Sequence, residues 1–198
     1  VPARENKTIS VVTALYNTDA KFLKEYVDSF LNQSYQFGQL VLADASDDAH
    51  SYVGEYITSL NSDKIKYVKL NGNFGISGNT NLAVSYAQGD YICLADHDDV
   101  LSPDALYQMA KAIEDTGADF IYSDEALFDT DWTNPIVAHF KPDYSYYYLT
   151  NCNYICHLAC MKRSIFTIVF SVILIGLIIA ANIFSVANSP TSLTNSSS

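Results

Sequence analysis

The 198-residue chain has few basic residues: 11 Lys and Arg stand against 22 Asp and Glu, which gives a formal net charge of −11. A protein that binds the backbone of nucleic acids needs clustered Lys and Arg to neutralise the phosphates. The charge balance therefore argues against a nucleic-acid partner. An acidic protein can still hold phosphate groups where a bound metal ion supplies the positive charge.

Cysteine is also scarce, and its four residues give no basis for a disulfide scaffold. Cys152, Cys156 and Cys160 follow a Cys-x3-Cys-x3-Cys pattern that lacks the Cys-x2-Cys of zinc ribbons. They lie in an apolar segment, so small buried thiols explain them better than a metal site. Cys93 falls inside a predicted buried strand.

The sequence has no initiator Met and no signal peptide, so we expect Val1 to follow a longer amino-terminal part or a cleavage site. Charge is absent from residues 167–187, which read TIVFSVILIGLIIAANIFSVA. As a helix this run would span about 30 Å, the thickness of the hydrocarbon core of a bilayer. A transmembrane helix is therefore predicted here, with a buried core helix as the alternative.

The flanks of this apolar run predict its orientation. Lys162 and Arg163 precede it, whereas the tail of residues 188–198 carries no charge. The positive-inside rule then places the globular part, residues 1–166, in the cytoplasm. The tail is rich in Ser, Thr and Asn and is expected to be disordered.

The globular part alternates between strand and helix patterns, which predicts one α/β domain with a mostly parallel sheet and right-handed βαβ units. Strands are predicted over 8–13, 39–43, 64–70, 91–95 and 119–123, and helices over 22–31, 53–60, 79–88 and 102–117. A turn-rich loop over 71–78 leads into the third helix. Gly117 is expected to end the fourth.

The fourth predicted strand ends in three carboxylates within four positions: Asp96, Asp98 and Asp99. Like charges at this spacing repel and raise one another's pKa unless a cation neutralises them. A divalent cation with oxygen ligands is the usual neutraliser. The alternative is a solvated acidic loop before the helix that starts near Ser102.

Polar residues also follow two other predicted strands. Asn17 comes after the first strand and Asp44 after the second. In a parallel α/β sheet, ligands bind outside the carboxyl ends of the strands. Asn17, Asp44 and the acids of 96–99 are therefore expected to converge on one crevice.

Four ordered segments resemble family 2 glycosyltransferases. Residues 9–17 are similar to the opening strand of the family, and 41–48 to the end of its second strand. Residues 73–83 match the Gly-rich loop, and 96–99 match the DxD segment. Residues 122–125 and 153–158 further resemble members that build bacterial surface polysaccharides, such as rhamnose-containing chains.

The resemblance implies a Rossmann-like GT-A fold, a nucleotide-diphosphate-sugar donor and a divalent metal, Mn²⁺ or Mg²⁺. Asp44 would bind the nucleotide base, and Asp96 the ribose. The metal would be bound by Asp98 and Asp96, with Asp99 close by. The remaining implied donor-site residues are Ala14, Tyr16, Asn17, Asn73 and Gly75.

The chain departs from the family in two places. Thr80 stands where many members carry an Arg that pairs with phosphate. After residues 161–166 the family continues into an acceptor-binding half with an acidic base, whereas the apolar run begins here at once. Asp124, Glu125 and Asp143 are the weak candidates for that base.

The resemblance predicts an inverting, metal-dependent glycosyltransferase, anchored in the membrane, that passes a sugar to a glycan or lipid-linked glycan of the cell surface. One alternative is a membrane-tethered remnant that binds the donor without transfer. Another is a DxD phosphatase, with Asp96 as nucleophile, Asp98 as acid/base and Val100 completing the pattern.

A cluster of aromatic residues precedes the cysteine segment. It consists of Tyr144, Tyr146, Tyr147 and Tyr148. Burial in a core or an interface is the first interpretation, and a platform on which a sugar stacks is the alternative.

Overall fold

The structure is a computed structural model that describes residues 7–129 and 133–166. Its strands are β1 (Ile9–Leu15), β2 (Gly38–Asp44), β3 (Ile65–Lys69), β4 (Tyr91–Leu94), β5 (Phe120–Tyr122), β6 (Glu125–Leu127), β7 (Val137–His139) and β8 (Ala159–Lys162). Its helices are α1 (Ala20–Leu31), α2 (Tyr52–Ser59), α3 (Gly75–Ser85), α4 (Ala105–Thr116) and α5 (Tyr146–Leu149), with a short 3-10 turn at Asp48–His50.

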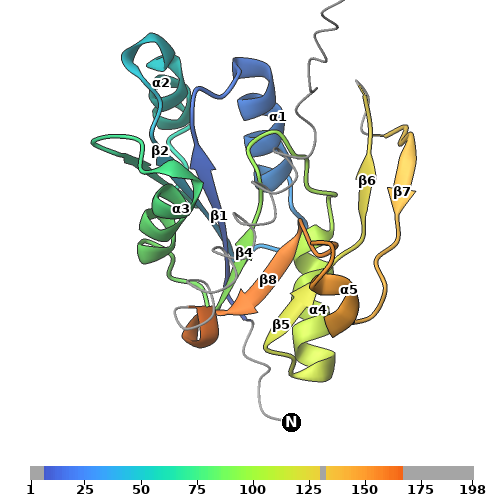
Figure 1. The fold of residues 1–198 in the computed structure, drawn as a ribbon. Coiled ribbons are helices and arrows are strands. Elements are labelled where there is room, and N and C mark those ends of the chain that lie inside the picture. Colours follow the sequence, from blue (N-terminus) through green and yellow to red (C-terminus); the bar gives the residue numbers. More distant parts are fainter. Residues whose placement is uncertain (1–6, 130–132, 167–198) are drawn as a thin grey trace, which may run out of the picture.

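The main sheet has six strands in the order β3-β2-β1-β4-β8-β5 (Figure 1). Strands β1 to β4 pair in parallel, and β8 runs antiparallel to both of its neighbours, β4 and β5. Strands β6 and β7 form a separate antiparallel pair beside the main sheet. The fold is therefore the predicted α/β type, with a mixed and mostly parallel sheet.

Both faces of the sheet are covered, because the central strands are apolar at almost every position. On one face, Ile9, Val11 and Leu15 of β1 belong to a core that includes buried residues of α1, α2 and α4. On the other face, Val12 packs in a second cluster with Ala83 of α3. Successive β1 side chains thus point to opposite layers, as strand geometry requires.

All five predicted strands are present, with small shifts at their ends. The strand β8 was not predicted, and it separates β5 from β4. It is four residues long, and an apolar run of that length carries no clear period of its own.

The cysteine prediction is confirmed for two thiols. Cys160 in β8 lies opposite Cys93 in β4, and both are buried. Cys152 is exposed and Cys156 is only partly buried, so burial of the whole group was wrong. The reason is that the strand begins only at Ala159, after both of these residues.

Helix α3 begins at Gly75, four residues before its predicted start. Two side chains stabilise this earlier start: Asn73 Oδ1 accepts a hydrogen bond from the Gly75 amide at 2.9 Å, and Asn79 Oδ1 accepts one from the Phe74 amide at 3.0 Å. Gly75 itself has φ +73°, a conformation that favours glycine.

Helix α4 starts at Ala105, three residues later than predicted, after a turn in which the Ala105 amide donates to the Ser102 carbonyl. Its predicted end is confirmed. Gly117 caps it in the left-handed conformation with φ +67°.

Within residues 7–129 and 133–166, no helix is long and apolar enough to cross a membrane. The predicted span of residues 167–187 and the predicted tail of 188–198 lie outside the described residues. Both stay predictions, as does the cytoplasmic location inferred from them.

Candidate functional site

Asn17 lies just after β1, beyond Ala14 and Tyr16, and it contacts the chain that follows β2. The Asn17 amide donates to Ser46 Oγ at 2.8 Å, and its side chain exchanges hydrogen bonds with Asp47. Asn17 adopts φ +50°, a conformation that Asn tolerates better than most residues. The structure thus brings together the first two predicted strand ends.

Asp44 lies at the end of β2, and its side chain is only 1% exposed. Its oxygens accept hydrogen bonds from the Ser46 amide at 2.8 Å, Tyr67 Oη at 2.7 Å and Lys69 Nζ at 3.1 Å. Burial raises the pKa of Asp44, but these donors outweigh it and hold the pKa below its usual value. The carboxylate therefore joins β2 to β3, and its predicted contact with a nucleotide base stays a prediction.

The Gly-rich loop closes the amino end of α3. Asn73 Oδ1 accepts from both the Gly75 amide and Asn79 Nδ2, each at 2.9 Å. Phe74 and Ile76 are exposed beside them, whereas Thr80 is buried. Asn73 and Gly75 thus form a fixed turn, and their predicted role in donor binding is untested by this geometry alone.

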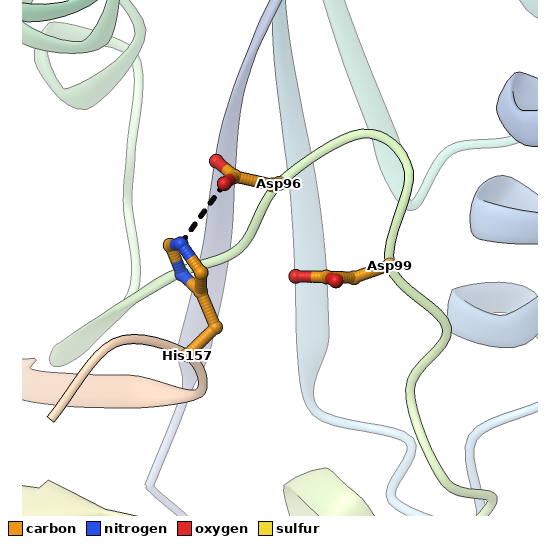
Figure 2. Close-up of side chains that lie close together, drawn as sticks. All are labelled: Asp96, Asp99 and His157. Atoms are coloured by element: carbon orange, nitrogen blue, oxygen red, sulfur yellow. Dashed lines mark ion pairs between the residues drawn. The ribbon is translucent and has the colours of Figure 1, made fainter. Parts of the chain in front are cut away.

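Three side chains converge beyond the end of β4: Asp96, Asp99 and His157. One ligand atom from each lies within 4.8 Å of the others (Figure 2). His157 Nε2 is 3.0 Å from Asp96 Oδ2, and its Nδ1 is 3.3 Å from the Leu94 carbonyl oxygen. Of the predicted metal ligands, Asp96 and Asp99 therefore come together, while Asp98 is exposed and is not a member of this cluster.

His157 acts in the same direction on both carboxyls, and burial makes them differ. The hydrogen bond from His157 lowers the pKa of Asp96, whereas burial of Asp99 outweighs the charge of His157 and raises the pKa of that carboxyl. Burial would lower the pKa of His157, but Asp96 and Asp99 outweigh it and raise the pKa to about 9. The crowded acids thus have a protein cation beside them.

The donor set fits a divalent metal. Carboxylate oxygens suit Mg²⁺ and Mn²⁺, and a neutral imidazole nitrogen is a common additional ligand of transition metals. Asp96 and Asp99 would supply the oxygens and His157 Nε2 the nitrogen. The cluster lies where the predicted DxD site was expected, with a different third member.

Sequence reasoning missed His157 as a site residue. It lies 58 positions after Asp99, within the Cys-x3-Cys-x3-Cys segment. The sequence did carry one signal, because residues 153–158 contribute to the family resemblance. Its proximity to the acids arises because β8 pairs with β4, with Ala159 opposite Leu94.

The candidate bases lie outside this cluster. Asp124 Oδ1 accepts from the Lys141 amide at 2.8 Å, and Glu125 pairs with His139 at 2.9 Å and with Lys141 at 3.0 Å. Burial raises the pKa of Glu125, but His139 and Lys141 outweigh it and lower the pKa, which weakens Glu125 as a base. Asp143 is exposed. Their predicted catalytic role stays a prediction.

The tyrosine cluster is on the surface, so its interpretation as core is wrong. Tyr147 is 82% exposed, and Tyr144, Tyr146 and Tyr148 are exposed as well. Tyr148 stacks on the buried Tyr154, with ring centroids 4.8 Å apart. Tyr146 and Tyr147 of the short helix α5, and Tyr144 before it, are exposed, which leaves both an interface and a sugar platform open.

Comparisons with known proteins agree with this fold. The chain is 38% identical over 154 residues to the uncharacterized protein y4gI of Sinorhizobium fredii, covering 76% of this chain and 17% of that protein. It is similar to S. aureus TarS in complex with UDP-GlcNAc, with 26% identity and a TM-score of 0.50 over 58% of this chain and 33% of that one.

A second solved structure has the same fold: the mannosyltransferase PcManGT of Pyrobaculum calidifontis in complex with GDP-Man and Mn²⁺. It has a TM-score of 0.60 and 18% identity, covering 82% of this chain and 46% of that one. The chain thus spans less than half the length of each of these three proteins. The model of the family described as "Glycosyl transferase family 2" matches residues 10–168. The chain therefore belongs to glycosyltransferase family 2.

Proposed function

We propose that this domain binds a nucleotide-diphosphate sugar and a divalent metal, and that it provides the donor half of a glycosyltransferase site. The observation that carries the proposal is the convergence of Asp96, Asp99 and His157 at the carboxyl ends of the strands, within 4.8 Å of one another. Membership of the family supports the reaction class. The donor complexes of TarS and PcManGT support the ligand class.

In this proposal, Asp96, Asp99 and His157 hold a Mn²⁺ or Mg²⁺ ion. A metal bound there supplies positive charge that stabilises the departing diphosphate, as a Lewis acid. Asp96, Asp99 and His157 thereby set where the diphosphate binds. Asp98, which is exposed outside the cluster, is free to contact the donor from the solvent side.

The nucleoside is placed over the ends of β1 and β2. The segment of Tyr16 and Asn17 and the loop after Asp44 form one hydrogen-bonded unit there. Tyr16 is half-exposed and offers a ring face to a base, while Lys69 offers a cationic donor beside Asp44. Asn73 and Gly75 extend the same rim on the α3 side.

The acceptor is proposed to be a glycan or lipid-linked glycan of the cell surface, on the strength of the sequence resemblance. Inversion at the anomeric carbon requires a carboxylate that takes the proton of the acceptor hydroxyl. Asp124 and Glu125 remain the weak candidates among the described residues. Donor binding without transfer stays the alternative, because neither of these carboxylates belongs to the cluster of Asp96, Asp99 and His157. The phosphatase interpretation loses its basis, since the family model includes the DxD segment.

Calorimetric titration of the full chain with Mn²⁺ tests the metal site. We expect Asp99→Ala and His157→Ala each to weaken Mn²⁺ binding by about tenfold or more, because each removes a ligand. The control is His50→Ala, which breaks another imidazole–carboxylate pair, to Asp47, and should leave the affinity unchanged. Wild-type affinity in both ligand variants would contradict the site.

Titration with UDP and GDP, with and without Mn²⁺, tests the donor class. We expect one nucleotide to bind at least about tenfold more tightly when Mn²⁺ is present, because a metal held by these residues would supply positive charge beside the diphosphate. Asp99→Ala should abolish this difference. If neither nucleotide binds under either condition, the proposed function is wrong.

A further inference from the structure

Lys141 is a buried cation outside the proposed metal site. It follows β7, and its side chain is 1% exposed. A buried ammonium group is costly unless its hydrogens find acceptors. Lys141 Nζ has three: Glu125 Oε2 at 3.0 Å, the Ile155 carbonyl oxygen at 2.6 Å and the His157 carbonyl oxygen at 2.7 Å. These match the three donors of an ammonium group.

Asp124, just before β6, and Glu125, the first residue of β6, also hold Lys141. Its backbone amide donates to Asp124 Oδ1 at 2.8 Å, while Glu125 pairs with its side chain. Glu125 is itself fixed by His139 at 2.9 Å. Lys141 thus has one backbone and one side-chain contact outside the segment of Ile155 and His157.

The segment that Lys141 contacts has no regular secondary structure of its own. It lies between α5 and β8, and Cys156 at its centre adopts φ +41°. Such a segment needs hydrogen bonds from outside to hold its carbonyl groups. Lys141 binds the carbonyls on both sides of Cys156, so one side chain fixes this turn.

The backbone segment that Lys141 holds also carries the imidazole of His157. On the far side of that residue, Nδ1 lies 3.3 Å from the Leu94 carbonyl oxygen and Nε2 lies 3.0 Å from Asp96 Oδ2. Figure 2 shows the ring reaching from its loop toward the carboxylate of Asp96. Lys141 therefore holds the backbone of His157, while Leu94 and Asp96 hold its imidazole.

We propose that Lys141 is a positioning residue for the metal site, acting through His157. The three acceptors of its ammonium group do not include Asp96 or Asp99, and it holds the His157 carbonyl so that the imidazole faces these two acids. This inference rests on the proposed metal site. Partners of metal ligands typically change metal affinity by about 10- to 100-fold when they are removed, because they orient the ligand.

A double-mutant cycle tests this role in the full chain, with Mn²⁺ affinity as the measurement. Lys141→Met keeps the apolar stem and removes the three donors. We expect it to weaken Mn²⁺ binding by about tenfold or more. In the His157→Ala background the same substitution should cause no further loss, because Lys141 acts only through that imidazole.

A purely structural role predicts a different pattern. If Lys141 merely stabilised the fold, its replacement would lower the melting temperature and leave Mn²⁺ affinity unchanged, or would weaken binding equally in both backgrounds. Either result overturns the inference. The control is Tyr122→Phe, which removes the hydrogen bond from Tyr122 Oη to the Pro142 carbonyl oxygen at 2.7 Å. It loosens the residue next to Lys141 and leaves the hydrogen bonds of Lys141 to Ile155 and His157 in place, so Mn²⁺ affinity should not change.

If Lys141→Met does not fold, Glu125→Gln takes its place in the test. Glu125 is only partly buried, so its replacement is expected to disturb the fold less. It removes the counter-charge that anchors Lys141, and we expect a several-fold loss of Mn²⁺ affinity that disappears in the His157→Ala background. Unchanged affinity would overturn the inference. Absence of Mn²⁺ binding by the wild-type chain would instead overturn the proposed metal site, and this inference with it.

Discussion

Single residues decide how closely like charges can lie at the end of β4. Asp96 and Asp99 point into one space, and repulsion alone would disfavour two charged carboxylates there. The positive charge of His157 favours the charged form of both acids. The pKa of Asp96 falls, whereas burial outweighs His157 at Asp99 and raises its pKa. A cationic imidazole therefore does in the metal-free protein part of what a bound dication would do.

Asp44 shows the same principle at a buried position, and its variant has a predictable pH dependence. Asp44→Asn keeps the shape but loses the charge that accepts from Tyr67 and Lys69. At pH 7 we expect a loss of about 1–3 kcal/mol in the free energy of unfolding, measured by urea denaturation.

The folded-state pKa of Asp44 lies below its unfolded value of about 3.9. The charge of Asp44 therefore stabilises the fold above that value, and this contribution is lost as the pH falls through the folded pKa. The difference between the wild type and Asp44→Asn should shrink below about pH 4. Asp63→Asn makes the same charge change at an exposed position and serves as the control. A difference that stays constant down to pH 3 would contradict the role of the Asp44 charge.

At the scale of elements, the carboxyl end of α4 was predictable, whereas the start of α3 and a short inserted strand were not. Gly117 ends α4 because glycine alone adopts its left-handed conformation without cost. Asn73 and Asn79 start α3 earlier than expected, since their side chains satisfy amides that the helix leaves free. The strand β8 depends on edges that β4 and β5 offer, and those edges exist only in the folded sheet.

The end of α4 gives a clean test of backbone conformation. No atom lies within 4 Å of a Cβ built at Gly117, so a side chain there causes no clash. The only cost in stability comes from the left-handed φ of +67°. We expect Gly117→Ala to lower the free energy of unfolding by about 1 kcal/mol. Gly117→Asn should cost less, because Asn tolerates this conformation. Equal stability of all three proteins in urea would contradict the assignment.

At the scale of the whole molecule, two buried layers leave one edge of the sheet for chemistry. Helices α1, α2 and α4 cover one face and α3 the other, so the carboxyl ends of the strands remain accessible. Asp44 is the last residue of β2, and the Gly-rich loop follows β3. Asp96 and Asp99 of the proposed metal cluster follow β4. A parallel sheet with both faces covered places its binding residues at that edge.

The predicted membrane segment is tested on the whole chain. We expect the complete 198-residue chain to float with phosphatidylcholine vesicles in a density gradient, because residues 167–187 are apolar throughout. A chain that ends at Phe166 should stay in the dense fractions. Both proteins floating, or neither, would contradict a membrane anchor at 167–187.

The sequence by itself determined the α/β class, the five principal strands, the end of α4 and the positions of the acids, because each depends on local patterns of apolar, glycine and charged residues. The tertiary structure alone decided which acid joins which partner. Asp98 lies outside the cluster and His157 inside it, since the pairing of β8 with β4 brings the two segments together. Sequence spacing does not predict this pairing, because the hydrogen bonds that form it join strands more than 60 residues apart.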